Sequence, residues 1–560
     1  MPLVFAAFAV GCWGSGDDKP KSGERTTSSA TVAGAKGGTL ITLASAAPSG
    51  SADPQVHYTG QLWQFVIVTH DPLVGFKRTA GAEGVKLVPD LATEIPKSTD
   101  HGRTWTFRLR RGIKFSNGQP LTADDVRATF ERLFKIGNSP NAGGWYSVIV
   151  GGDACVKARK TCDLSDGIVV DGDRVTFHLT MGDPDFLYKL AMPFAFILPA
   201  DTPTKNVDIP PPGTGPYKWV KYAPNSEMRV ERNPFFKAWS NTAQPPGLPD
   251  AIVQRFGLSV GAEVTQVERG EADWISSSSD TIPSDRLDEI GTRYADQVHI
   301  NPVLATQYFA FNTRIPPFDN LQARQAVNFA VNRDDLVTLQ GGDKLATPTC
   351  QVLPPASRGY EPYCPYTANP DGRWTGPDMT KARQLVEESG TKGARVKVNS
   401  DTTDVNKAFG LYFVDLLDDL GYEASAQFLA SDIQYPYAQN SKNNVQFAWS
   451  VWYADYPAAS AFLPVLLSCE SFHPNSNSNP NISQFCDKGI DATMDEAAAK
   501  AVADPDGADE LWAQADRAVT DQAPWVAMFT PKLLDFTSKR VKGFQFHPQW
   551  GFLLAQASVQ

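Results

Sequence analysis

Six cysteines form three close couples along the chain: Cys155 and Cys162, Cys350 and Cys364, and Cys469 and Cys486. Six cysteines allow fifteen pairings, but short loops close most easily, so the nearest neighbours are the expected disulfides. Such disulfides need an exported protein, and free buried thiols are the alternative. A zinc site is disfavoured, because His473 is the only nearby histidine and no second one lies at ligand spacing.

The sequence contains none of the common catalytic motifs. We find no H-E-x-x-H, P-loop, G-x-S-x-G or complete EF-hand pattern. The segment 504–507 lacks the remaining calcium ligands and indicates the start of a helix instead. The seven histidines stand singly, at 57, 70, 101, 178, 299, 473 and 547. We therefore expect no enzyme, no cofactor and no bound metal; a secreted hydrolase with a triad drawn from distant segments is the remote alternative.

Length and charge define the class of protein. A chain of 560 residues, 42% apolar and 20% charged, is globular and predicts two or three domains. Its formal net charge of −11 argues against a nucleic-acid partner. The densest basic cluster, residues 103–114, alternates with Trp105, Phe107 and Leu109, which indicates the solvated face of a strand.

The N-terminus predicts export and a lipid anchor. Residues 2–11 are apolar, too short to span a bilayer, and end in small residues before Cys12. This pattern resembles a bacterial lipobox, although the usual basic region is missing and Ala9 replaces the more usual leucine. Residues 13–37, rich in Ser, Gly, Lys and Thr, predict a flexible tether. A buried cysteine near an ordinary N-terminus is the alternative interpretation of Cys12.

Strand and helix patterns alternate from residue 38 onward. Period-two alternation and turn residues predict strands at 39–43, 105–109, 174–179, 216–222, 227–231 and 395–398. Thr122 and Asp125 predict a capping box on a helix whose apolar face is Val126, Phe130, Leu133 and Phe134. Further helices are expected over 321–331, from Asp378 to Gly390, and along the stripe of Val405, Phe409, Phe413, Leu416 and Leu420. These alternations predict an α/β fold.

Several ordered motifs resemble the family 5 extracellular solute-binding proteins. The most extensive are Leu87 to Ala92 and Trp105 to Val126, with its R-R-G-I-K-F-S-N-G-Q-P-L-T core. Gly213 to Tyr217, Arg232 to Pro234, Phe311 to Val327 and Trp452 to Pro457 follow in the family's order, as does the segment around Pro524. Each motif is modest, but together they make the resemblance strong from about residue 38 to the C-terminus.

The resemblance implies a two-lobed clamshell of the periplasmic-binding-protein type, with an extra domain inserted in one lobe. Residues 1–12 would be the signal tail, and lobe I would combine 38–71, 210–300 and 520–560. The inserted domain would be 72–209 and lobe II 301–519. Each cysteine couple would then lie inside one segment and leave the hinge free to close.

The resemblance also implies a ligand site. Asp455 matches the family position whose carboxylate holds the amino terminus of a peptide, and Trp452, Tyr453 and Tyr456 would wall the pocket. Trp449, Trp145 and Tyr146 are further candidates, each with a core position as the alternative. Arg358, Arg373 and Lys442 are unranked candidates for a ligand carboxylate. The family often continues Asp-Pro where this chain has Ala458 and Ala459, which puts strict peptide specificity in doubt.

The predicted function is capture of a small ligand, expected to be a peptide, for import. The partners would be the permease subunits of an ABC importer, and the protein would act as a lipid-anchored monomer on the extracellular face of a bacterial cytoplasmic membrane, or in a periplasm. An oligosaccharide, an opine or a metal chelate is the alternative ligand class.

Overall fold

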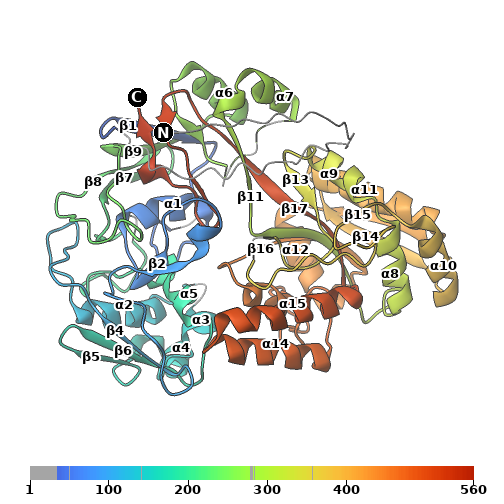
Figure 1. The fold of residues 1–560 in the computed structure, drawn as a ribbon, viewed down its shortest axis with the longest axis horizontal. Helices are drawn as coiled ribbons and strands as arrows, with labels where there is room; N and C mark the ends of the chain where they lie inside the picture. The colour runs from blue at the N-terminus through green and yellow to red at the C-terminus, as the bar shows by residue number, and fades with distance from the viewer. Residues whose placement is uncertain are drawn as a thin grey trace, which may run out of the picture. The chain divides into compact units, whose positions relative to one another are not determined.

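A computed structural model describes residues 35–560, except 49–50, 140–141, 208, 278–279, 281, 283 and 356. Residues 34–560 form one unit of the fold, and three sheets organise it (Figure 1). The predicted signal tail and Cys12 lie outside the described residues.

The first sheet has five strands in the order β10-β1-β9-β8-β7. The strand β1 (Thr39–Ala44) runs parallel to both of its neighbours, β9 and β10, whereas β8 is antiparallel to both β7 and β9. The other strands are β7 (Tyr217–Ala223), β8 (Glu227–Arg232), β9 (Ala251–Phe256) and β10 (Trp274–Ile275), and the accompanying helices are α1 (Gly60–Thr69), α6 (Val260–Arg269) and α7 (Ser284–Arg293). Every residue of α1 after Gly60 is buried, so this helix lies inside the core.

The second sheet has seven strands, with the order β11-β17-β12-β16-β14-β15 and β13 paired to β17. Its strands are β11 (Val298–Pro302), β12 (Ala305–Phe311), β13 (Ala346–Pro348), β14 (Arg395–Asp401), β15 (Glu423–Leu429), β16 (Phe447–Tyr453) and β17 (Trp525–Phe536). Its helices are α8 (Leu321–Ala330), α9 (Arg333–Gln340), α10 (Met379–Ser389), α11 (Asp404–Asp419) and α12 (Ser431–Gln439). A separate apolar core, which includes Phe309, Phe413 and Phe447, fills this part of the fold.

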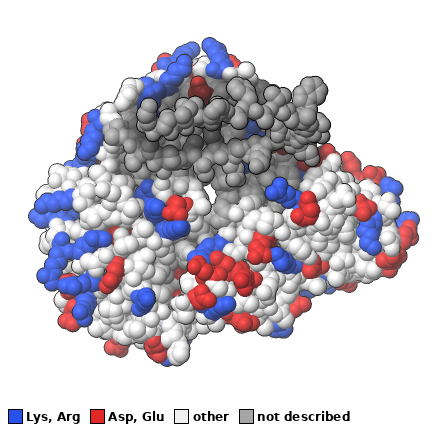
Figure 2. All heavy atoms as spheres, viewed as in Figure 1, with Lys and Arg blue, Asp and Glu red and all other residues white. Residues whose placement is uncertain are grey.

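The third sheet is small and lies within residues 72–209. Its strands are β4 (Thr104–Arg108), β5 (Ile168–Asp171) and β6 (Arg174–His178), with helices α2 (Ala123–Lys135), α3 (Ala142–Tyr146), α4 (Gly152–Lys157) and α5 (Phe186–Leu190). In β4, Trp105 and Phe107 are buried and Thr106 and Arg108 are exposed, as the alternation predicts. Figure 2 shows basic side chains along the edge where Figure 1 places this sheet.

Two more helices and three short ribbons complete the fold. Helices α14 (Lys488–Ala501) and α15 (Pro505–Asp521) lie side by side, and the short α13 (Leu463–Leu467) packs on them (Figure 1). The ribbons pair β2 (Val74–Phe76) with β3 (Leu87–Pro89), β18 (Val541–Lys542) with β21 (Ser558–Val559), and β19 (Phe546–His547) with β20 (Gly551–Phe552). The last ribbon places residues 546–551 at the cavity discussed below.

Helix termini follow the predicted capping signals. Thr122 and Asp125 form the capping box of α2, and the Asp378 side chain accepts a hydrogen bond from Lys381 N at the start of α10. Gly390 ends α10 with a φ of 67°, a conformation that glycine adopts without strain. Asp504 caps α15, so the segment 504–507 is a helix start, as expected. The α11 stripe is buried at its predicted positions except Val405, which is exposed in the first turn.

All three predicted disulfides are present. Cys155 is bonded to Cys162, Cys350 to Cys364 and Cys469 to Cys486, with Cα–Cα distances of 4.4, 5.0 and 4.3 Å. Each one closes a short loop, so each restricts the unfolded chain locally.

The strand β17 is part of the seven-stranded sheet and also contacts the five-stranded sheet. Its first residues pair with β12, and residues 532–536 pair with β11. Asp535, near its end, accepts a hydrogen bond of 2.9 Å from the indole Nε1 of Trp274 in the five-stranded sheet. The residue boundaries drawn for the lobes at 300 and 520 therefore stay a prediction.

A buried ion pair ties the loop before α1 to helix α2. Arg132 donates from Nη1 and Nη2 to the two carboxylate oxygens of Asp53, at 3.1 and 2.5 Å, and from Nη1 to Gln55 Oε1 at 2.6 Å. The Arg132 side chain is 3% exposed and that of Asp53 is fully buried. Removing one partner leaves an uncompensated buried charge.

We predict that Arg132→Met lowers the free energy of unfolding by about 3–5 kcal/mol, because Asp53 loses its cation in a buried place. Arg127 lies on the same helix in a solvated pair with Asp124, so Arg127→Met is the matched control and should cost less than about 1 kcal/mol. Urea unfolding of both variants measures the difference. Equal losses would contradict this account of the Arg132 pair.

Candidate functional site

A cavity of about 530 Å³ lies where β16, the end of β17, the start of α1 and the last ribbon meet. Its lining is mostly aromatic and aliphatic, with a few polar groups. The aromatic members are Tyr58, Trp63, Tyr435, Trp452, Tyr453, Phe546 and Trp550. Its size and lining are those of a small-molecule site.

Asp455 is the only acidic group among the described residues that line this cavity, and none of them is basic. Burial raises the pKa of the Asp455 carboxyl to about 7, because the charged form loses hydration in an apolar place. The Tyr58 hydroxyl donates a hydrogen bond to Asp455 Oδ1. A phenol supplies no positive charge, so the cavity favours a ligand that brings a cation to this carboxylate.

The loop that bears Asp455 is held on several sides. Ala454 N donates to Leu304 O at 2.8 Å, and Trp452 Nε1 donates to Ala461 O at 2.8 Å. Gln549 Nε2 donates to the backbone oxygen of Asp455 at 2.9 Å. These bonds position the carboxylate before any ligand arrives.

Three of the predicted ligand residues line the cavity: Asp455, Trp452 and Tyr453. Trp452 is half-buried and Tyr453 is exposed at its mouth. Trp449 is three residues from Trp452 and therefore points to the opposite face of β16. It packs against the Phe309 and Phe413 core and is absent from the lining. The predicted contact of Trp449 with ligand stays a prediction, and its core position agrees with the alternative interpretation.

Tyr456, Trp145 and Tyr146 also lie outside the described lining of this cavity, so their predicted role stays a prediction. Tyr456 is buried, stacks on Tyr188 with centroids 5.9 Å apart, and donates from its hydroxyl to Asp185 Oδ2 at 3.1 Å. Trp145 packs edge-on against Tyr456 at 5.7 Å, and Tyr146 is fully buried with its hydroxyl donating to Lys189 O. These rings join residues 142–188 to the loop after Asp455, so they are positioning and core residues.

The three basic candidates lie elsewhere as well. Arg358 pairs with Asp506 and Asp509, at 2.7 and 2.9 Å. Arg373 is exposed in a turn where its N–H donates to Asp371, and Lys442 is exposed in the short helix Ser441–Asn443. None of the three is among the lining residues, so a ligand carboxylate would meet none of them in this cavity.

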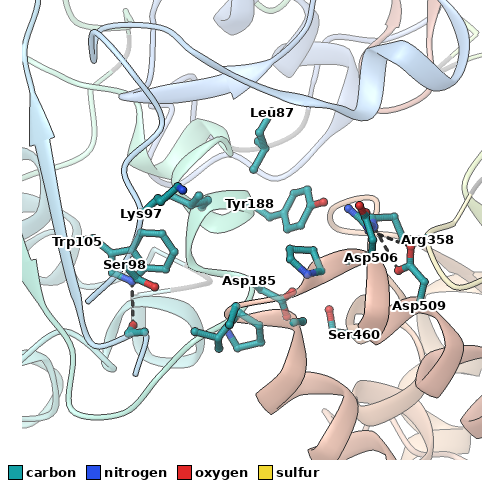
Figure 3. Close-up of a pocket in the computed structure, with 18 of the residues that line it drawn as sticks. Leu87, Lys97, Ser98, Trp105, Asp185, Tyr188, Arg358, Ser460, Asp506 and Asp509 are labelled. Carbon is teal, nitrogen blue, oxygen red and sulfur yellow. Dashed lines mark hydrogen bonds and ion pairs between the residues drawn. The ribbon is translucent and has the colours of Figure 1, made fainter. Parts of the chain in front are cut away.

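A second, larger cavity of about 1010 Å³ lies between residues 82–105 and 184–188 on one side and α14 and α15 on the other (Figure 3). Arg358 is matched, since it faces Asp506 and Asp509, whereas Asp185 accepts the Tyr456 hydroxyl and Lys97 is exposed. Ala458 and Ala459, the departure from the family pattern, are buried at its edge. Because lysine and arginine side chains stand among its carboxylates, this larger cavity is the weaker candidate for an ammonium ligand.

Sequence reasoning missed Tyr58, Trp63, Tyr435, Gln549 and Trp550, which complete the Asp455 cavity. They come from four segments far from Asp455 in the sequence. The only local signal is an aromatic residue beside Gly or Pro in an irregular segment, as in Tyr58-Thr59-Gly60 and Pro548-Gln549-Trp550-Gly551. Such a signal is too common to single these residues out.

Comparison with known proteins places the chain in a family. The model of bacterial extracellular solute-binding proteins, family 5, matches residues 86–473. The chain belongs to this family of solute-binding proteins. Because the family consists of binding proteins, the hydrolase alternative is set aside.

Individual relatives cover nearly the whole chain. The di/tripeptide-binding protein 2 of Pseudomonas aeruginosa strain UCBPP-PA14 is 26% identical over 91% of this chain and 93% of its own length. The glutathione-binding protein GsiB of Escherichia coli K12 is 26% identical over 82% of this chain and 84% of its own length. The solved structure of clavulanic acid biosynthesis oligopeptide binding protein 2 superposes with a TM-score of 0.83, at 24% identity, over 94% of this chain and 96% of that chain.

That superposition confirms the predicted fold class, a mixed α/β fold of two lobes with an extra domain. Within the described residues, no helix combines the length and apolarity needed to cross a membrane.

Proposed function

We propose that this chain captures peptides with a free amino terminus outside the cell and delivers them to the permease subunits of an ABC importer. One observation supports the ligand class above all others: Asp455 is half-buried in an aromatic cavity whose described lining contains no cation. A peptide ammonium supplies that charge and can also donate hydrogen bonds to the carboxylate. The relatives named for di/tripeptides and glutathione support the same class.

The aromatic lining supports a contribution from the first side chain of the peptide. Trp63, Trp452 and Trp550 offer apolar surface beside the carboxylate. An oligosaccharide is the alternative ligand, because sugars also stack on such rings, but a neutral sugar would leave the Asp455 charge uncompensated.

Anchoring and oligomeric state belong to the proposal too. We expect lipidation at Cys12 and a monomer as the acting unit, with residues 13–37 as the tether. Expressed with a complete export signal, Cys12→Ser should be released to the medium while the wild-type protein stays with membranes. Cell fractionation measures this, and equal retention of both proteins would reject the anchor.

We predict that Asp455→Asn weakens binding of the dipeptide phenylalanyl-alanine by about thirtyfold or more, because the desolvated charge pair is lost. N-acetylation of the dipeptide removes the same pair from the ligand side, so the two losses should be strongly non-additive. Calorimetry on the four combinations measures the coupling. Arg358→Gln is the control: it disturbs the larger cavity and should leave the affinity within about twofold.

Additive losses, or an Asp455→Asn affinity close to wild type, would contradict the pairing. A large loss for Arg358→Gln alone would place the ligand in the larger cavity.

We predict that peptide affinity falls as the pH is lowered. The pKa of Asp455 is raised to about 7, so the ligand-free carboxyl is protonated at lower pH and must release its proton to bind an ammonium. Lowering the pH from 7.5 to 5.5 should weaken the affinity by roughly twentyfold. Raising the pH above about 8 should also weaken it, because the amino terminus of the peptide deprotonates. The other titratable groups in the described lining are phenols, which ordinarily titrate near 10. Calorimetry across this range should show the decline in the wild type and not in Asp455→Asn.

A further inference from the structure

We propose that the Asp455 cavity recognises the amino end of its ligand and does not require a charged carboxyl end, so that peptide amides bind at least as well as free peptides. This inference rests on the proposed function and specifies its substrate class: amines with an apolar group next to the ammonium.

The charge of the cavity is the first argument. Among the described lining residues, Asp455 is the only one that is charged near neutral pH. The ten residues between 35 and 560 that the structure does not describe include no Lys, Arg or His either. A ligand carboxylate bound here would lose hydration, find no cation in the lining and lie near a carboxylate of like charge.

Two basic side chains adjoin the lining, and each makes contacts outside it, although Arg78 Nη1 has no hydrogen-bond partner among the described residues. Arg78 lies behind the Trp550 ring, 5.7 Å from its centroid, and donates to Ala243 O and Ile67 O at 3.2 Å. Lys532, next to the lining residue Leu533, donates from Nζ to Asp343 O at 2.6 Å. Neither is part of the lining.

Neutral groups and rings form the remainder of the site. Tyr58 and Trp63 pack edge-on with centroids 5.3 Å apart, and Trp63 and Trp550 do so at 6.2 Å, so the three rings form one continuous wall. Such a wall attracts an ammonium through the faces of its rings and accepts an apolar side chain.

Two lining residues offer unsatisfied neutral polar atoms. Trp550 is 4% exposed, and its Nε1 has no hydrogen-bond partner among the described residues. The Oε1 of Gln549 is likewise unpaired there, while its Nε2 donates to the Asp455 backbone. Both atoms are enclosed by protein in the ligand-free structure and neither carries a charge, so neither supplies a cation for a ligand carboxylate.

The test compares four probes by calorimetry at pH 7.5: phenylalanyl-alanine, its carboxyl-terminal amide, and the N-acetyl form of each. We expect the amide to bind with a Kd equal to that of the acid or up to about tenfold lower, and both acetylated probes to bind at least about thirtyfold more weakly. Arg78→Gln and Lys532→Gln serve as variants that change the two basic groups beside the lining and should not change the ratio of acid to amide.

The outcomes separate the two proposals. If the amide binds more than tenfold more weakly than the acid while acetylation also weakens binding, the carboxylate is gripped and this inference is overturned, although the proposed function stands. If acetylation has no effect, or neither free amine binds to the folded protein, the proposed function fails and this inference fails with it. If only the amide binds, the inference is supported.

Discussion

Partial burial of the Asp455 carboxylate, in a described lining that contains no cation, is the constraint on which this site depends. An apolar surrounding raises the pKa of Asp455 to about 7, so the carboxyl of the ligand-free protein is partly protonated near neutral pH. A phenol from Tyr58 satisfies one hydrogen bond but not the charge. An ammonium ligand supplies the positive charge that the Asp455 carboxylate lacks in the ligand-free protein. Selectivity follows from this need for a positive charge more than from the shape of the cavity.

The region inserted between the strands of the five-stranded sheet has a part in this arrangement although it contributes little to the lining. Its Asp185 accepts the hydroxyl of Tyr456, the residue directly after Asp455, and Tyr188 stacks on the same ring. The loop that bears the carboxylate is thus clamped between this region and the seven-stranded sheet. Movement of this region relative to the seven-stranded sheet would displace Asp455. The position of the carboxylate would then depend on how far the lobes close.

Local signals predicted most of the fold, and distant contacts explain what the sequence did not reveal. Capping at Thr122, the ends of α10 and the three disulfides follow from residues a few positions apart, where spacing alone decides the contact. Asp455 was found through a family motif. Its cavity partners Tyr58 and Gln549 lie 397 and 94 residues away in the sequence, and no local pattern connects them. The sequence did not reveal which aromatic residues near Asp455 line the cavity: strand alternation directs Trp449 to the other face of β16, and packing buries Tyr456.

A crystal structure of the protein with the ligand it retains from a native-like source tests the central claim most directly. The account predicts a ligand nitrogen within hydrogen-bond distance of the Asp455 carboxylate, with apolar ligand atoms against Trp452 and Trp550. A ligand bound instead in the larger cavity beside Trp105 and Arg358, or one that presents no cationic group to Asp455, would contradict it.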